Sequence, residues 1–219
     1  MKDALKNQRP DFMTSHEPKP RYVREQMLTD LPNLLTLSRI AVIPLLVLFV
    51  ALNAPWANFG AALLFTLAGI TDYLDGRLAR EWAQLSDFGR MLDPIADKLL
   101  IGATLMCLIG FRFHMPSFGI YPAIIIMLRE ILVSGLREYL ADLRISLPVT
   151  KLAKWKTGVQ MLALGLLLLG HPGTVFMGIG WLPAGGLGFA LLWVAAALTL
   201  ITGWDYLRAG LRHVGTPSA

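Results

Sequence analysis

Four aspartates stand close together in the sequence, and their spacing suits the binding of divalent metal ions. Asp72 and Asp75 are three residues apart, and Asp93 and Asp97 are four residues apart. On a helix, either spacing places both side chains on one face. Mg²⁺ prefers oxygen ligands and usually completes its shell with water and substrate phosphates. Two such ions on a diphosphate would stabilise both the attacking and the leaving oxygen of a displacement.

Small residues accompany the carboxylates. Gly76 and Ala79 follow the first pair on nearly the same face, and Gly89 begins a stripe that continues through Asp93 and Asp97. Small side chains let a ligand or a neighbouring helix approach the backbone. The connection between the two segments is short, so we expect antiparallel neighbouring helices whose carboxylates face each other. A single aspartate fits a solvated helix end equally well, but the whole set favours a metal-dependent phosphate site.

The composition indicates an integral membrane protein. Of the 219 residues, 55% are hydrophobic and only 16% are charged, and the mean hydropathy is +0.55. These values exclude an ordinary soluble domain. The single cysteine, Cys107, excludes an intrachain disulfide and fits a packed core thiol. We expect no nucleic-acid partner.

The apolar segments predict an all-α fold with six transmembrane helices. A spanning helix requires about 20 apolar residues, and residues 34–52 and 181–204 meet that length. Four shorter apolar runs reach it when they continue into neighbouring charged residues. The four extended segments are 59–80, 93–111, 118–137 and 154–170.

Lysine and arginine predict the orientation of these helices. Arg112 is the only basic residue in the connections after the first, third and fifth helices. The positive-inside rule therefore places both termini and all polar helix ends in the cytosol. We divide the chain into a disordered tail (1–20), an interfacial helix or linker (21–32), a six-helix domain (33–212) and a C-terminal tail (213–219).

The residues from Asp72 to Asp97 also resemble a known signature. They read Asp-x2-Asp-Gly-x2-Ala-Arg-x8-Gly-x3-Asp-x3-Asp, and every fixed position matches the signature of the CDP-alcohol phosphatidyltransferase family. The resemblance implies a six-helix membrane enzyme, often a homodimer. Such an enzyme transfers a phosphatidyl group from a CDP-linked lipid to an alcohol and releases CMP.

The resemblance also implies roles for individual residues. Asp97 is implied to be the base that takes the proton of the acceptor hydroxyl. The implied cofactor is Mg²⁺ or Mn²⁺, with two ions per site. The implied metal ligands are Asp72, Asp75, Asp93 and Asp97. The residues implied to bind CDP-diacylglycerol are Asn33, Thr36, Asp72, Gly76, Ala79, Arg80 and Gly89.

Basic residues beside the carboxylates indicate an acceptor that carries its own phosphate. Arg129 lies well inside the expected bilayer, where an ionisable residue suggests function. The alternative to a functional role for Arg129 is a structural ion pair, for instance with Glu130. The basic segment 151–157 could equally be a cytosolic flank whose side chains contact lipid headgroups. The residues that we assign to the acceptor phosphate are Arg39, Arg129, Arg137, Lys154 and Lys156.

The flanking motifs resemble one branch of the family, the bacterial phosphatidylglycerophosphate synthases. The similarity runs from about Leu31 to the sixth helix, and Ala153 stands where glycine is more common. It implies that CDP-diacylglycerol and sn-glycerol 3-phosphate give phosphatidylglycerophosphate and CMP. It also implies a bacterial inner membrane and an active site that faces the cytosol.

Two alternatives remain open at this point. In the first alternative, the protein belongs to the same family but uses a different acceptor. That acceptor is phosphatidylglycerol, as in a cardiolipin synthase, or serine or inositol phosphate. Outside the family, the acidic cluster is the ion site of a cation transporter. Transport sites lie near the bilayer midplane between repeats, whereas these aspartates collect at the cytosolic helix ends and the chain has no repeat.

Overall fold

The computed structural model describes residues 31–82, 87–111, 115–142 and 151–214, and these residues form helices joined by short connections. All six predicted helical segments are present. The predicted N-terminal tail (1–20) and all but the end of the predicted interfacial segment (21–32) lie outside the described residues. The helices are α2 (Leu31–Leu52), α3 (Pro55–Trp82), α4 (Asp87–Gly110), α5 (Ile120–Asp142), α6 (Lys151–Phe176) and α7 (Ala184–Val214), with a short 3-10 helix η1 (Ser117–Gly119) before α5.

Three helical segments of the described chain are long and apolar enough to cross a membrane. α2 has a shorter apolar stretch, Thr36–Leu52. In α3 and α4 the helix continues into charged turns, which shortens the apolar part. Six spanning helices therefore remain a prediction. The three qualifying segments are Ser117–Ala141, Leu152–Phe176 and Ala184–Gly210.

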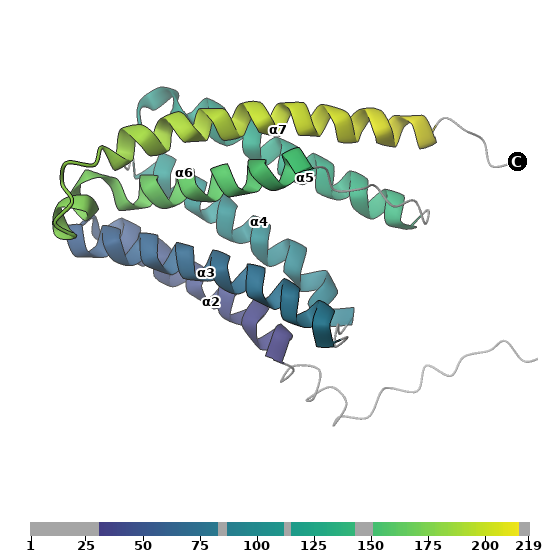
Figure 1. Ribbon diagram of the computed structural model, residues 1–219, viewed down its shortest axis with the longest axis horizontal. Helices are drawn as coiled ribbons and strands as arrows, with labels where there is room; N and C mark the ends of the chain where they lie inside the picture. The colour runs from purple at the N-terminus through teal and green to yellow at the C-terminus, as the bar shows by residue number, and fades with distance from the viewer. Residues whose placement is uncertain (1–30, 83–86, 112–114, 143–150, 215–219) are drawn as a thin grey trace, which may run out of the picture.

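Successive helices run in opposite directions, which gathers the charged helix ends together. Figure 1 shows the starts of α2, α4 and α6 at the same end of the molecule as the ends of α3, α5 and α7. This is the clustering that the sequence predicted. The side of the membrane on which this end lies stays a prediction.

The core is built from large aliphatic side chains on facing helices. α6 packs against α7 and α3, α2 packs against α3 and α4, and α5 packs mainly against α7. Phe65, Leu105, Ile126 and Leu164 are almost fully buried between these helices. Cys107 is also buried in this core, as expected for a packed thiol.

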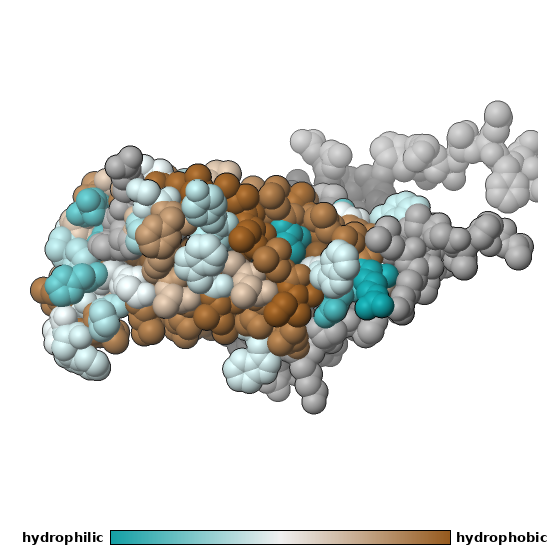
Figure 2. All heavy atoms as spheres, turned by 90° about the horizontal axis from the view of Figure 1, so that it is seen from above, coloured by the Kyte–Doolittle hydropathy of each residue, from teal (hydrophilic) through white to brown (hydrophobic). Residues whose placement is uncertain are grey.

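The outer surface is apolar along the helices. Figure 2 shows one face of the molecule, with a broad hydrophobic zone and hydrophilic residues concentrated toward its two ends. Met106 is 70% exposed and Leu128 is 64% exposed. An exposed apolar area of this extent marks a membrane or protein contact surface, which supports a membrane-embedded protein.

One feature of the packing differs from the sequence-based expectation. α3 and α4 were expected to be direct neighbours, but within the described residues they have little contact, and α2 packs against both of them. Few residues separate the two helices in the sequence, but α2 packs against both of them and takes the place of direct contact. The carboxylates of α3 and α4 therefore meet across α2.

Candidate active site

A buried arginine of α2 joins the carboxylates of α3 and α4. Arg39 forms an ion pair with Asp72 of α3, and its Nη2 lies 4.0 Å from Oδ1 of Asp93 on α4. The same Asp93 oxygen accepts a hydrogen bond of 2.5 Å from Thr36, one turn before Arg39. The three helices thus bring together four of the predicted site residues.

The burial of these groups is unequal. The Arg39 side chain is 2% exposed, whereas those of Asp72 and Asp93 are 47% and 46% exposed. A buried guanidinium is costly unless carboxylates pair with it. The two aspartates therefore satisfy the arginine on one side and remain open to solvent, or to a ligand, on the other.

The donor set fits divalent metal ions. Among the side chains that the structure describes, no three carboxylate, histidine or cysteine groups form a metal-binding cluster. The side chain of Asp75 lies outside that part, although the residue follows Asp72 by one turn of α3. Asp72 and Asp93 offer only hard carboxylate oxygens, which Mg²⁺ prefers, and they already converge on the positive charge of Arg39.

Asp97 lies one turn beyond Asp93 on α4 and links two regions of charge. The charges of Asp72, Arg39, Lys156 and Lys98 all act on its carboxyl group. It is partly buried, and it lines a pocket between α4 and α5. Asp97 is therefore placed between the carboxylate cluster and the basic residues of the later helices.

The pocket that Asp97 lines has a volume of about 470 Å³. Arg129 and Arg137 from α5, both predicted to bind the acceptor, line its wall together with Glu138. Lys154 is exposed on α6 and does not line this pocket. The structure thus brings part of the predicted acceptor set to the side of Asp97.

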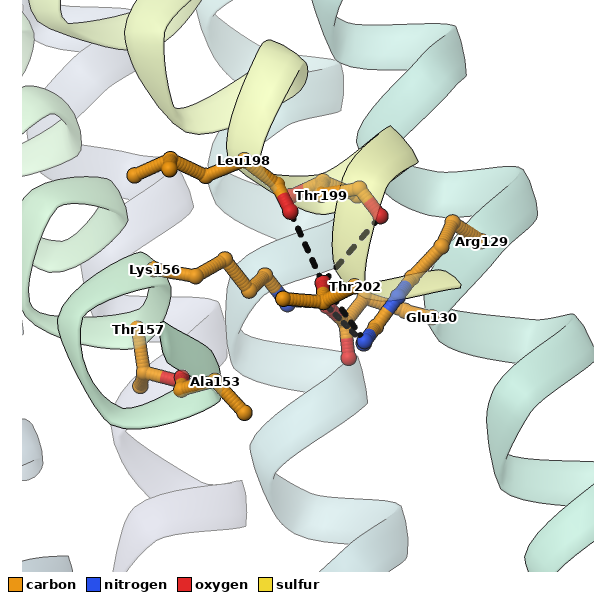
Figure 3. Close-up of polar contacts among 8 residues, drawn as sticks. All are labelled: Arg129, Glu130, Ala153, Lys156, Thr157, Leu198, Thr199 and Thr202. Carbon is orange, nitrogen blue, oxygen red and sulfur yellow. Dashed lines mark hydrogen bonds and ion pairs between the residues drawn. The ribbon is translucent and has the colours of Figure 1, made fainter. Parts of the chain in front are cut away.

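A buried polar network ties α5 to α6 and α7 beside this pocket (Figure 3). Glu130 forms an ion pair with Lys156 of α6, and its Oε1 lies 3.5 Å from Nη1 of Arg129. Arg129 also donates a hydrogen bond of 2.9 Å to Thr202 of α7. Its guanidinium carbon lies 5.6 Å from the ring centroid of Tyr206. The ion pair weighed for Arg129 in the sequence is therefore present.

A glycine of α7 makes room for this arginine. A Cβ placed on Gly203 would lie 2.8 Å from Cγ of Arg129 and 3.3 Å from its Nε. Such distances leave no space for a larger side chain unless the arginine moves. The absence of a side chain at residue 203 therefore lets Arg129 lie flat against α7.

Several predicted contacts cannot be placed, and others were missed. Arg39, which was assigned to the acceptor phosphate, lies among the aspartates in this structure, and its contribution to acceptor binding stays a prediction. Thr202 and Tyr206 were missed because a single threonine or tyrosine in an apolar segment gives no signal of its partner. The predicted residues whose side chains lie outside the described part are Asn33, Asp75, Gly76, Ala79, Arg80 and Gly89.

An apolar groove between α3 and α6 was also missed. Its volume is about 610 Å³, and its wall extends along α3 from Phe59 to Ile70, two residues before Asp72. Gly69 and Gly165 widen it, one from each helix. The groove leads from the carboxylate end of α3 into the apolar zone. Apolar residues in a membrane helix are common, so their pattern did not distinguish this groove from ordinary lipid-facing surface.

Comparison with known proteins identifies the family. A family model described as CDP-alcohol phosphatidyltransferase matches residues 29–201. Three bacterial relatives bear the name CDP-diacylglycerol--glycerol-3-phosphate 3-phosphatidyltransferase. The relative from Rickettsia bellii is 46% identical over 82% of this chain and 94% of its own. The relative from Cereibacter sphaeroides is 42% identical over 84% of this chain and 97% of its own. The relative from Shigella flexneri is 42% identical over 84% of this chain and 96% of its own. The match covers the helices that carry the aspartates and the basic residues, and the chain belongs to the CDP-alcohol phosphatidyltransferase family.

Proposed function

We propose that the protein transfers the phosphatidyl group of CDP-diacylglycerol to sn-glycerol 3-phosphate, which gives phosphatidylglycerophosphate and CMP. The relatives that carry this enzyme name match more than four fifths of the chain. The observation that carries the proposal is the position of Asp97, which lies one turn after Asp93 on α4 and lines a pocket together with Arg129 and Arg137. A metal–diphosphate site and an anion site thus meet at one carboxylate.

The metal site is formed by carboxylates from two helices. Asp72, Asp75, Asp93 and Asp97 would hold two Mg²⁺ or Mn²⁺ ions. When bound, such ions neutralise the diphosphate and stabilise the leaving phosphate oxygen. Arg39 keeps Asp72 and Asp93 close together before any ion arrives. Preorganised charge of this kind lowers the barrier because little must rearrange during the reaction.

The acceptor reacts from the pocket side. Asp97 takes the proton of the acceptor hydroxyl, and the hydroxyl oxygen attacks the phosphorus that bears the diacylglycerol. The bond between that phosphorus and the bridging oxygen breaks, and the bridging oxygen leaves with CMP. Arg129 and Arg137 bind the phosphate of the acceptor, which orients the hydroxyl toward Asp97.

The apolar groove suits one acyl chain of the lipid substrate. The stretch of α3 from Phe59 to Ile70 lines it and is about 16 Å long at the rise of an α-helix. One leaflet of the hydrocarbon core is about 15 Å thick. An acyl chain in the groove would therefore reach from the middle of the bilayer to the end of α3 that carries Asp72.

The acceptor assignment is tested by CMP release from the purified protein in detergent with CDP-diacylglycerol and Mg²⁺. The acceptor panel contains glycerol 3-phosphate, phosphatidylglycerol, serine, inositol and inositol phosphate. We expect release with glycerol 3-phosphate alone. Release with another member would retain the metal site but disprove the acceptor assignment. No release with any acceptor, with Mg²⁺ or Mn²⁺, would disprove the proposed reaction.

The Asp97→Asn variant should lose CMP release by about 100-fold or more, because a positioned general base contributes at least that factor. Its amide cannot accept the proton of the hydroxyl, although its size is unchanged. Asp205→Asn is the matched control, because Asp205 is exposed on α7. Near-normal turnover by a folded Asp97→Asn protein would exclude Asp97 as the base.

The Arg137→Ala variant should raise the KM for glycerol 3-phosphate about tenfold or more and leave the KM for CDP-diacylglycerol nearly unchanged. A hydrogen bond to a charged group contributes about 1.5–3 kcal/mol. Steady-state kinetics with each substrate varied in turn measures the two constants. Arg208→Ala removes the same charge from an exposed position of α7 and serves as the control. Equal rises in both KM values would indicate a scaffolding role.

The Gly165→Leu variant tests the groove. A Cβ at Gly165 has only Thr66 Oγ1 nearby, at 3.9 Å, so the first side-chain carbon of a leucine fits there, and the rest of the side chain would occupy part of the groove. We expect the KM for long-chain CDP-diacylglycerol to rise several-fold, and that for a dioctanoyl analogue to change little. Gly186→Leu is the control, because Gly186 is exposed on α7 with open space around it. An equal change in KM with both lipids would disprove the proposal that an acyl chain occupies the groove.

A further inference from the structure

Two buried cations beside the acceptor pocket share one carboxylate. Glu130 pairs with Lys156 and lies 3.5 Å from Arg129. The side chains of Lys156 and Arg129 are 5% and 11% exposed, and that of Glu130 is 19% exposed. Cations buried to this degree are costly without a counter-charge. Glu130 therefore balances both of them in the part of the chain that the structure describes.

The pocket as a whole has little charge to attract an anion. Three acidic and three basic side chains line it, and Glu130 is one of the acidic ones. Lys156 stands behind Glu130 and adds one positive charge. The Glu130 carboxylate lies beside both buried cations, so an anion that pairs with either of them must compete with Glu130.

We propose that Glu130 is an internal counter-anion that the phosphate of the acceptor displaces from Lys156 and Arg129. The inference rests on the proposed function and deepens it by naming a residue that determines acceptor specificity. A phosphate monoester carries about −1.5 to −2 charges near pH 7, whereas the carboxylate carries one. A phosphate group can therefore replace Glu130 with a gain in charge, and a carboxylate or neutral alcohol cannot.

The surrounding contacts limit how much must move. Arg129 is fixed from α7 by the hydrogen bond to Thr202 and by the ring of Tyr206. It therefore stays in place when the carboxylate leaves. The Lys156 ammonium has three donors, so it can keep one contact while it turns another toward phosphate. Figure 3 shows the side chains of Glu130 and Arg129 near Thr202, with the Lys156 side chain extending toward them from α6. The exchange therefore requires movement of the Glu130 side chain and not of Arg129.

The test measures the binding of inorganic phosphate, and its first readout, the shift of Tm, requires no turnover. The purified protein in detergent is titrated with phosphate, and the shift of Tm and the inhibition of CMP release are recorded. In Glu130→Gln the competing charge is gone, so we expect phosphate to bind about tenfold more tightly, the factor that corresponds to about 1.4 kcal/mol. The KM for glycerol 3-phosphate should fall in parallel, without a rise in kcat.

Glu138→Gln is the matched control. Glu138 lines the same pocket and is exposed on α5, so this variant removes the same charge from the pocket without touching the pair with Lys156. We expect a much smaller change in phosphate affinity. An equal tightening in both variants would overturn the proposal in favour of a general charge effect. Weaker phosphate binding by Glu130→Gln would overturn it in favour of a structural role.

A second variant covers the case in which Glu130→Gln does not fold. Glu130→Asp keeps the charge but shortens the side chain by one methylene, which weakens its reach to Lys156. We expect phosphate affinity between those of the wild type and Glu130→Gln, and a loss of affinity would overturn the proposal. If the wild type fails to use glycerol 3-phosphate, the proposed function fails, while tighter phosphate binding by the variants still supports the counter-anion.

Discussion

The ion pairs of Arg39 are the constraint on which the rest of the site depends. A guanidinium that is almost fully buried in α2 requires carboxylates nearby, and Asp72 and Asp93 supply them from two different helices. The same requirement draws α3 and α4 toward α2, so packing and charge balance are satisfied together. Because the aspartates remain about half exposed, the arrangement leaves carboxylate oxygens available to ligands.

A second charged cluster has the opposite ratio of carboxylates to cations. Around Arg39, two carboxylates balance one buried cation. Around Glu130, two cations, Arg129 and Lys156, share one carboxylate. The first cluster thus has oxygen donors to spare and suits metal ions. The second has hydrogen-bond donors to spare and suits anions. By these groups alone, the first cluster carries one net negative charge and the second carries one net positive charge. Unbalanced charge is costly in a membrane-embedded protein, so each cluster gains from a ligand of the opposite charge.

The sequence was sufficient for the helices, whereas the metal-binding role of the four aspartates stays a prediction. Apolar runs that end in charged turns gave all six helical segments, and the carboxylate spacing gave their shared faces. The sequence could not predict that α2 packs between α3 and α4, because the short connection between the latter two suggested direct contact. It also could not predict the pairing of Glu130 with Lys156, which are 26 residues apart, or the register that brings Thr202 to Arg129. These contacts depend on how whole helices pack, and no local pattern encodes that.

The separation of the two clusters has a chemical consequence. A diphosphate lipid and a phosphorylated alcohol are both anions. They would repel each other in one pocket that had no separate groups to neutralise each of them. In the proposed reaction, carboxylates that favour metal ions would bind one substrate, and arginine and lysine would bind the other. In the proposed reaction Asp97, which lies one turn after Asp93 and lines the arginine pocket, would accept the proton where the two substrates meet. Only an acceptor that brings its own negative charge gains from this division, which favours a phosphorylated acceptor over serine or free inositol.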